Sequence, residues 1–585
     1  MIQYISKLLY VLTDSKGKLV FIFLIFIATS VLEALGIGLI GPFINFAANP
    51  ESIHQVFLLD WAYQRLPLQS SKEFIPVLGL VVAIIFCLKT LCYFLANLYI
   101  YQFSFRQKSL LRSRLLNAYL YLPYTFHLNK NTSSIIKNII LETQKFCIQS
   151  LLPLLEASAN AVLIIILLVV LTRTDALLLV MISLVFLPTF LLFYGLRKKI
   201  ASWGANLSQA EQGMIKVINH GLGGLKETRV IGCEAYFEQE MVWQSQKFEK
   251  AAVLYKLSQK TPRIIIETLL LLFVLFFISI SQIFFKQNIQ DLTASLAVFS
   301  VAAIRLIPAT GKIINAFGSI QNSNYALDML YLDLQEIANQ DYISSKNNQY
   351  LHNIVFSDKI IIDNISYYYP GTTTPAIEQI SFTINKGQSI GLIGKSGAGK
   401  TTLVDVILGL LQSKNGEILV DGISIYQNIR SWQNIVGYIP QSIFIIDDSI
   451  KSNIAFGVPE SLIDLEKLSQ VIKATQLEEL VEHLPEGINT KIGERGVRLS
   501  GGQRQRVGIA RALYHEREIL VLDEATAALD QETEHLVSNA INSLAGRKTL
   551  IIIAHRLSTV KNCDCLYLLD KGRIVKSGSY EEVVV

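Results

Sequence analysis

A glycine-rich stretch in the second half of the chain carries the clearest chemistry. It spans Gly394–Thr402 and lies between the apolar run Ile390–Ile393 and the helix-like segment Leu403–Leu411. Such a loop binds phosphate because glycines let backbone N–H groups converge on the oxygens. Lys400 supplies positive charge for the β- and γ-phosphates, and Thr401 offers a hydroxyl to Mg²⁺. The predicted phosphate-binding residues are Gly394, Lys395, Ser396, Gly397, Ala398, Gly399, Lys400, Thr401 and Thr402.

Two adjacent acids further along the chain fit the same chemistry. They end the apolar run Ile519–Leu522 as Asp523 and Glu524. Asp523 suits direct or water-mediated contact with Mg²⁺, and Glu524 is placed to orient or deprotonate a water that attacks the γ-phosphate. An acidic pair at a strand end is a weak signal alone, but after a phosphate loop it predicts hydrolysis of a nucleoside triphosphate.

Two weaker features gain meaning beside this loop. The segment Leu499–Gln503 opens a second helix with Ser500, Gly501, Gly502 and Gln503, and reads either as an ordinary helix N-cap or as a second phosphate cradle. One γ-phosphate does not need two cradles from one subunit, so the second would serve a nucleotide held by a partner. Tyr369, before a Pro-Gly turn, can stack on a base, although an ordinary strand aromatic explains it as well.

The elements that must position these residues form an α/β pattern from about residue 353 to 585. Short apolar, β-branched runs alternate with helical segments, as in a sheet covered by helices. The predicted strands are Ile360–Tyr368, Ser389–Ile393, Val436–Ile439, Ile519–Leu522, Thr549–Ile553 and Cys565–Leu569. The polar segment 333–352 is expected to be the linker that precedes this domain.

The first half, residues 1–332, is expected to be a helical membrane domain. Hydrophobic residues make up 51% of the chain and charged residues 17%, which favours a chain partly in lipid over a soluble helical protein. The predicted spans are Leu19–Phe46, Ile75–Phe103, Leu151–Leu171, Ala176–Leu196, Ile264–Phe285 and Leu292 to about Phe317. Lys and Arg concentrate after the second and fourth spans, which places those connections, both termini and the α/β domain in the cytosol.

Net charge and cysteine spacing give no support for a nucleic-acid-binding protein or a cysteine-based metal site. A net charge of +5 gives no argument for nucleic acid as a partner. The six cysteines are scattered, none in a C-x-x-C pair, and are expected to be free thiols.

Together these motifs resemble the nucleotide-binding domain of ABC transporters, and the first half resembles the exporter type. The resemblance implies that Tyr369 stacks on the base, Gly394–Thr402 is the phosphate loop and Leu499–Gln503 the signature motif. It further implies that Gln441 reaches Mg²⁺ and water, that Glu524 is the catalytic base and that His555 lies near the γ-phosphate. One copy of each half implies a half-transporter that works as a homodimer with ATP and Mg²⁺, with a heterodimer as the alternative. A channel or regulator in which ATP only gates would have been favoured by a missing Glu524, which is present.

The cargo is indicated only by basic residues in the membrane half. Lys89, Arg263 and Arg305 lie in or at the ends of apolar runs, where a charge is costly and often functional. They either face an anionic substrate or pair internally, for example with Glu33. The first-span segment Leu32–Ile44 and the surroundings of Arg263 and Arg305 resemble bacterial flippases of lipid-linked oligosaccharides.

That resemblance implies ATP-driven export or flipping of a polyprenyl-diphosphate-linked oligosaccharide by a multi-pass protein of the inner (cytoplasmic) membrane. The alternative is export of another lipid (a phospholipid or a lipopolysaccharide precursor), a peptide or a drug. Lys89 stands where that branch has an arginine, and a lysine keeps the charge but loses the bidentate fork.

Overall fold

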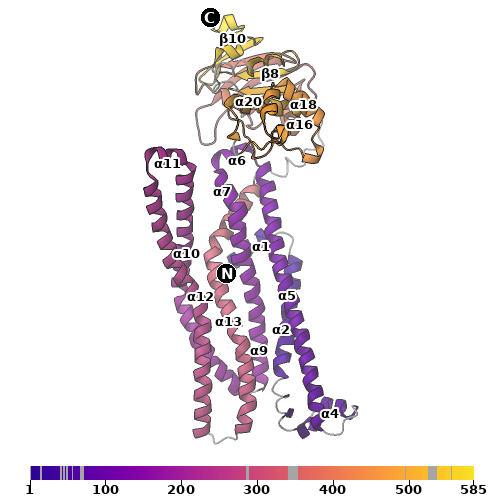
Figure 1. Cartoon of the computed structure of the whole chain (residues 1–585), viewed down its shortest axis with the longest axis vertical. Helices are drawn as coiled ribbons and strands as arrows, with labels where there is room; N and C mark the ends of the chain where they lie inside the picture. The colour runs from indigo at the N-terminus through magenta and orange to yellow at the C-terminus, as the bar shows by residue number, and fades with distance from the viewer. Residues whose placement is uncertain are drawn as a thin grey trace. The chain divides into compact units, whose positions relative to one another are not determined.

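The computed structural model divides the chain into two compact units (Figure 1). One comprises Met1–Leu120 and Asn131–Gln340, the other Tyr121–Lys130 and Asp341–Val585. The residues described are 2–12, 16–39, 43, 46–47, 50–55, 57–65, 71–174, 176–284, 289–339, 353–493, 496–524, 537–539, 541–554 and 556–584. Each unit is described by itself.

The first unit is helical throughout its described residues. Its α-helices are α1 (Ile2–Val11), α2 (Lys16–Gly38), α4 (Phe57–Gln64), α5 (Ser71–Tyr121), α7 (Thr132–Lys137), α8 (Thr143–Lys145), α9 (Leu152–Thr174), α10 (Ala176–Gly223), α11 (Leu225–Ile231), α12 (Glu234–Phe284) and α13 (Ile289–Asn339). A 3-10 turn, η1 (Pro50–Gln55), and two π-helical turns, η2 (Asn138–Glu142) and η3 (Phe146–Leu151), complete it. α10 and α12 run side by side and are joined at one end through α11 (Figure 1).

The long helices run through the predicted spans as far as the described residues extend. α2 comprises Lys16–Gly38, and of the remainder of the first predicted span only residues 39, 43 and 46 are among the described residues. Among the described residues, two helical stretches, Glu73–Tyr121 and Thr132–Val169, are long and apolar enough to cross a membrane. The prediction of six spans therefore goes beyond what these helices establish.

The end of α13 differs from the sequence prediction. Residues 333–339, assigned to the linker because they are polar, continue the helix to Asn339. Leu327, Leu330 and Leu334 lie on one buried face, and Asp333 is itself buried. Its Oδ2 accepts hydrogen bonds from Tyr119 Oη (2.5 Å) and Asn138 Nδ2 (2.6 Å). The polar composition of residues 333–339 therefore did not indicate a linker, because Asp333 is buried and hydrogen-bonded to Tyr119 and Asn138 within the helical unit.

The second unit is an α/β domain with two sheets. The strands are β1 (Lys359–Tyr367), β2 (Ile377–Asn385), β3 (Ser389–Ile393), β4 (Asn415–Val420), β5 (Ile423–Ser424), β6 (Val436–Ile439), β7 (Ile519–Asp523), β8 (Thr549–Ile553), β9 (Cys565–Asp570) and β10 (Arg573–Gly578). An antiparallel sheet has the order β2-β1-β4-β5, and a larger sheet has the order β10-β9-β3-β8-β7-β6. In the larger sheet β9, β3, β8, β7 and β6 are parallel, and β10 is antiparallel to β9.

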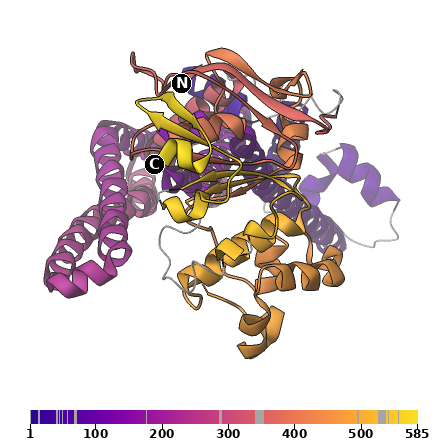
Figure 2. The ribbon, with the colours of Figure 1, turned by 90° about the horizontal axis from the view of Figure 1, so that it is seen from above.

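Helices pack on both faces of the larger sheet, α15 (Lys400–Ile407) on one and α20 (Gly501–Tyr514) on the other. The other helices of this unit are α6 (Tyr124–Asn129), α16 (Ile429–Ile435), α17 (Ile450–Ile454), α18 (Leu465–Ala474), α19 (Glu478–His483), α22 (Leu557–Val560) and α23 (Tyr580–Val584), with the 3-10 turns η5 (Ile425–Gln427), η6 (Glu460–Leu462) and η7 (Gly487–Asn489). Figure 2 shows the orange helices of residues 450–514 on one side of the unit and the salmon antiparallel strands on the other.

The register of the larger sheet decides which side chains share a face. Val521 lies opposite Ile551, which lies opposite Ile390, and these three pack with α15. The residues between them, such as Leu520 and Ile552, pack with α20 on the other face. The central strands are therefore apolar throughout, as expected for parallel strands covered on both faces, and the predicted strand positions are confirmed to within one or two residues.

Candidate functional site

The sheet order brings the phosphate loop and the acid pair to one edge. The loop follows β3 and the acids end β7, with β8 between the two strands. Carboxyl ends of parallel strands meet at the same edge, where open α/β sheets bind their ligands. The backbone also demands glycine in the loop. Gly394 has φ 149° and a Cβ there would lie 2.3 Å from Leu569 O, while Gly399 has φ 100°.

Lys400 lies inside the curl of the loop. Its Nζ donates to the carbonyls of Gly394 (2.7 Å) and Lys395 (3.1 Å). Burial lowers the pKa of Lys400, and the charges of Glu524 and Asp523 oppose that shift. Asp523 and Glu524 are therefore close enough to Lys400 to interact with it electrostatically, as expected if all three face the same bound phosphate.

Tyr369 lies against the start of α15. Its Oη is 3.1 Å from Thr402 Oγ1, and its ring packs edge-on against that of Tyr367 at a centroid separation of 5.2 Å. The predicted base-stacking aromatic is thus held beside the phosphate loop, although stacking itself stays a prediction.

The acid pair receives two hydrogen bonds from the segment that ends β6. Tyr438 Oη donates to Asp523 Oδ2 over 3.2 Å, and Gln441 Nε2 donates to Glu524 Oε2 over 2.7 Å. Glu524 holds a left-handed backbone, φ 50°, which is uncommon outside glycine and frequent at functional sites. The carbonyl of Gln441 accepts from Gln505 Nε2 at 2.7 Å, which ties this segment to α20. Gln441 and Glu524, both predicted site residues, are therefore brought together.

The donor set around the acids fits Mg²⁺. Thr401 offers a hydroxyl, Asp523 a carboxylate that is 8% exposed, and Gln441 the amide oxygen that remains when its nitrogen faces Glu524. Hard oxygen donors of this kind are the ligands that Mg²⁺ prefers.

Three residues near the site were missed by sequence reasoning. Burial and the charge of Asp523 raise the pKa of Asp405, on α15, to about 6. Burial raises the pKa of Tyr438, and the negative charge of Asp523 adds to the shift. Burial also raises the pKa of Tyr124 on α6, with a smaller contribution from the charge of Asp405. Tyr438 could have been found from the pairing of β6 with β7, whereas no local signal marks Asp405 or Tyr124.

The predicted signature segment forms a helix N-cap. Ser500 Oγ accepts from Gln503 N at 3.2 Å, and Gln503 Oε1 accepts from Ser500 N at 2.8 Å. These reciprocal bonds make a capping box at the start of α20. A role for this segment at a partner's nucleotide stays a prediction.

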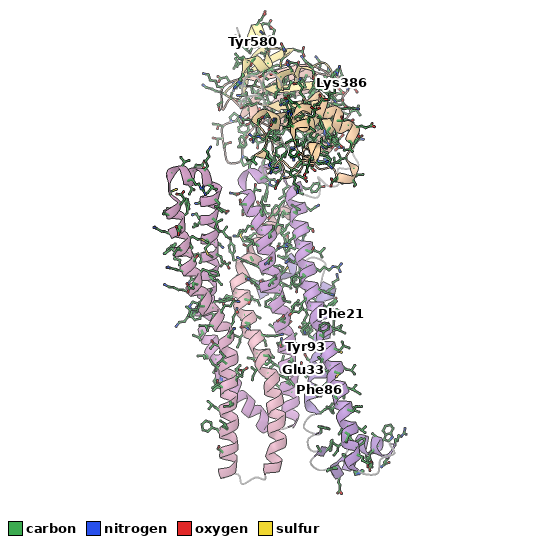
Figure 3. The ribbon with its side chains drawn as sticks, in the orientation of Figure 1. Phe21, Glu33, Phe86, Tyr93, Lys386 and Tyr580 are labelled. Atoms are coloured by element: carbon green, nitrogen blue, oxygen red, sulfur yellow. The ribbon has the colours of Figure 1, made fainter. Side chains whose placement is uncertain are left out.

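Two of the predicted membrane cations share the carboxylate of Glu33, a residue of the helical unit that is labelled in Figure 3. Lys89 Nζ lies 3.2 Å and Arg305 Nε 3.1 Å from the same Oε1 of Glu33. The side chains of Lys89 and Glu33 are 5% and 7% exposed, whereas that of Arg305 is 45% exposed. Lys89 Nζ is within ion-pair range of Glu33 but lacks hydrogen-bond geometry. The internal pairing that the sequence left open is therefore present for both.

Comparison with known proteins identifies the machinery. Residues 377–527 match the ABC transporter family, a range that includes the phosphate loop, Gln441, the signature segment and both acids. The chain is 28% identical over 610 residues to an ATP-dependent lipid A-core flippase of Shewanella oneidensis, covering 99% of this chain and 95% of that protein. The chain is an exporter-type ABC half-transporter.

Other relatives match this half-transporter over less of their length. ATP-dependent lipid A-core flippases from Pseudomonas aeruginosa and Cupriavidus pinatubonensis are 31% and 40% identical, over 63% and 38% of this chain. The alignments span 60% and 38% of those relatives, less than two thirds in each case. A solved bacterial Atm1-family ABC exporter with ATP bound is 22% identical with a TM-score of 0.68, over 95% of this chain and 96% of its own, and shows the same fold.

Some predicted residues of the half-transporter fall outside the described parts. His555, which was predicted to lie near the γ-phosphate, is outside the described residues. Arg263 lies within α12, but its side chain is outside the described part of the structure.

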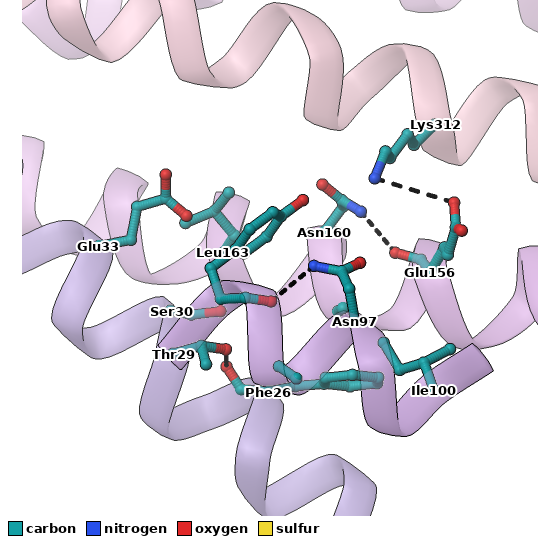
Figure 4. A pocket seen from close by; sticks show the side chains of 13 residues that line it. Phe26, Thr29, Ser30, Glu33, Asn97, Ile100, Glu156, Asn160, Leu163 and Lys312 are labelled. Carbon is teal, nitrogen blue, oxygen red and sulfur yellow. Dashed lines mark hydrogen bonds and ion pairs between the residues drawn. The ribbon is translucent and has the colours of Figure 1, made fainter. Parts of the chain in front are cut away.

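A small pocket with polar and apolar lining lies among α2, α5, α9 and α13 of the half-transporter (Figure 4). Its volume is about 30 Å³, room for one or two waters. Glu33, Asn97, Glu156, Asn160 and Lys312 supply much of its polar lining. Asn97 Nδ2 and Asn160 Nδ2 donate to carbonyls of their own helices, those of Tyr93 and Glu156. Glu33 thus lines this pocket and also carries the two cations.

Proposed function

We propose that this half-transporter works as a homodimer that uses ATP hydrolysis to export or flip an anionic lipid-linked substrate across the cytoplasmic membrane. The substrate we favour is a polyprenyl-diphosphate-linked oligosaccharide. The observation that carries the choice is the group of Glu33, Lys89 and Arg305, in which two cations share one carboxylate and one formal positive charge is left over. A charge retained within apolar helices is costly and is a functional-site candidate.

Within this group Arg305 is the residue placed to meet a ligand. Its side chain is 45% exposed and only its Nε atom is the one paired with Glu33, so the guanidinium fork points beyond the pair. Lys89 is almost fully buried and acts through Glu33, by neutralising the carboxylate so that Arg305 keeps its attraction for phosphate.

The ATP site supplies the energy in this proposal. Mg²⁺ bound with ATP neutralises phosphate charge. Lys400 and the loop amides hold the β- and γ-phosphates, and Asp523 and Thr401 hold the metal. Glu524, oriented by Gln441 at 2.7 Å, positions and deprotonates the attacking water.

A second subunit completes the proposed machine. The cap of Ser500 and Gln503 at α20 presents a helix N-terminus suited to a partner's γ-phosphate. The turn at α11 also exposes apolar side chains suited to a protein neighbour, since Val230 is 80% and Ile231 73% exposed.

The membrane arrangement in this proposal has six spans, with the α/β domain and both termini in the cytosol. The apolar parts of α2, α5, α9, α10, α12 and α13 supply them. Two stretches meet the length and composition of a span among the described residues, and the basic connections support the orientation.

The substrate is tested by ATPase stimulation in liposomes. Purified protein is assayed with a polyprenyl-diphosphate oligosaccharide, lipid A-core or phospholipid alone. We expect the diphosphate lipid to stimulate hydrolysis most. Arg305→Ala should weaken its apparent affinity about 10- to 100-fold, the loss of one charge-assisted hydrogen bond, with basal hydrolysis retained.

Lys312→Ala is the matched control, because it removes a positive charge seven residues along α13 that pairs with Glu156 and not with Glu33. Equal losses of basal and stimulated activity in Arg305→Ala would assign Arg305 a structural role. Stimulation by lipid A-core instead would favour the second candidate, a lipopolysaccharide precursor, which the similarity to lipid A-core flippases supports.

A further inference from the structure

The segment that ends β6 contacts both members of the acid pair, one residue on each. Tyr438 donates to Asp523, and Gln441, three residues later, donates to Glu524. The two acceptors are neighbours in sequence. Two short segments on adjacent parallel strands are therefore joined by a matched pair of side-chain hydrogen bonds.

Strand register explains why Tyr438 reaches Asp523. β6 and β7 pair with Tyr438 opposite Val521 and Ile439 opposite Leu522. Asp523 lies two residues beyond Val521 and so on the same face of the sheet. Ile439 belongs to the opposite face, packed with α20. The offset of about 6.5 Å along the strand requires a long side chain with a terminal donor, which tyrosine provides.

Chemistry fixes the direction of the bond. A carboxylate is an acceptor only, so the phenol donates its proton to Asp523 Oδ2. This bond restricts rotation of the carboxylate. Outer partners of this kind orient metal-binding carboxylates and tune metal affinity.

We propose that Tyr438 is a positioning residue for the Mg²⁺-binding carboxylate of Asp523, so that the end of β6 orients both acids at once. Gln441 acts on the catalytic base and Tyr438 on the metal ligand. The proposal rests on the ATPase assignment and is independent of the cargo. Failure to transport a diphosphate lipid would leave it untouched.

The test measures metal binding with the full-length protein in nanodiscs. Free Mn²⁺ is followed by electron paramagnetic resonance in the presence of a non-hydrolysable ATP analogue. Tyr438→Phe keeps the ring and removes the hydroxyl. We expect Mn²⁺ to bind about 3- to 30-fold more weakly, while nucleotide affinity in EDTA changes less than about twofold. The Mg²⁺ concentration for half-maximal hydrolysis should rise in parallel, with a near-normal rate at saturating Mg²⁺.

Tyr426→Phe is the matched control. The hydroxyl of Tyr426 contacts Ser413 N and Leu411 O in the same unit and neither acid, so Mn²⁺ affinity should equal that of the unmodified protein. The proposal is overturned if Tyr438→Phe binds Mn²⁺ normally. It is also overturned if metal-free nucleotide binding falls equally and the unfolding temperature drops, because the ring would then serve only packing.

Discussion

At the residue scale, the acid pair is the most constrained feature of the ATP site. Glu524 combines a left-handed backbone with two hydrogen bonds, from its own N to Ile553 O at 3.0 Å and from Gln441 Nε2 to its carboxylate at 2.7 Å. Holding a non-glycine residue in this conformation costs on the order of 1 kcal/mol. The strain is consistent with a carboxylate aimed at a reacting group rather than at solvent.

Glu524→Gln tests this role. The amide keeps the shape of the side chain but cannot accept a proton. We expect nucleotide binding within about threefold of normal and hydrolysis reduced by roughly 10²- to 10⁴-fold, the range of a general base. Phosphate release and nucleotide binding are measured on the same sample.

Glu518→Gln is the control for this change, since Glu518 precedes the same strand and pairs at the surface with Lys386 at 3.2 Å. Hydrolysis that persists undiminished in Glu524→Gln would remove Glu524 from the role of base.

The residues that sequence could predict are those whose type and spacing are local. The loop Gly394–Thr402 and the acids after β7 have this property, because strand, loop and helix follow one another in the chain. The contact of Tyr438 with Asp523 depends on the register of two strands that are about 80 residues apart. The pairing of Glu33 with Lys89 and Arg305 depends on helix packing, so sequence could only leave it open.

At the element scale, α13 shows how polar residues can be misread. The chain from Asp333 onward is polar, yet α13 continues to Asn339 because Asp333 accepts hydrogen bonds from Tyr119 and Asn138 within the bundle. Strand positions were easier to predict, since the parallel strands are short apolar runs bounded by polar segments.

Asp333→Ala should destabilise the helical unit. It leaves two buried donors, on Tyr119 and Asn138, without this acceptor, at a cost of about 1–3 kcal/mol for each group left unsatisfied. The unfolding temperature of the purified protein reports the loss. Asp328→Ala is the control, because its pair with Lys7 is about one-third exposed on both sides and such pairs contribute roughly 0–1 kcal/mol. Equal shifts for the two variants would show that the Asp333 cluster does not hold α13.

At the scale of the whole molecule, the proposed transporter couples an ATPase domain to a membrane domain that carries the group of Glu33, Lys89 and Arg305. The match to the ABC transporter family and the ATP motifs identify the ATPase domain. The proposed lipid cargo is supported by the similarity to lipid A-core flippases. The central claim is that hydrolysis at Lys400 and Glu524 moves an anionic lipid across the bilayer.

The most direct test is translocation of a fluorescent polyprenyl-diphosphate oligosaccharide in liposomes that contain the purified protein. The fraction of label protected from an external quencher or glycosidase is followed after ATP and Mg²⁺ are added. The account predicts ATP-dependent movement by the unmodified protein and none above background for Lys400→Ala. Movement that is equal without ATP, or undiminished in Lys400→Ala, would contradict it.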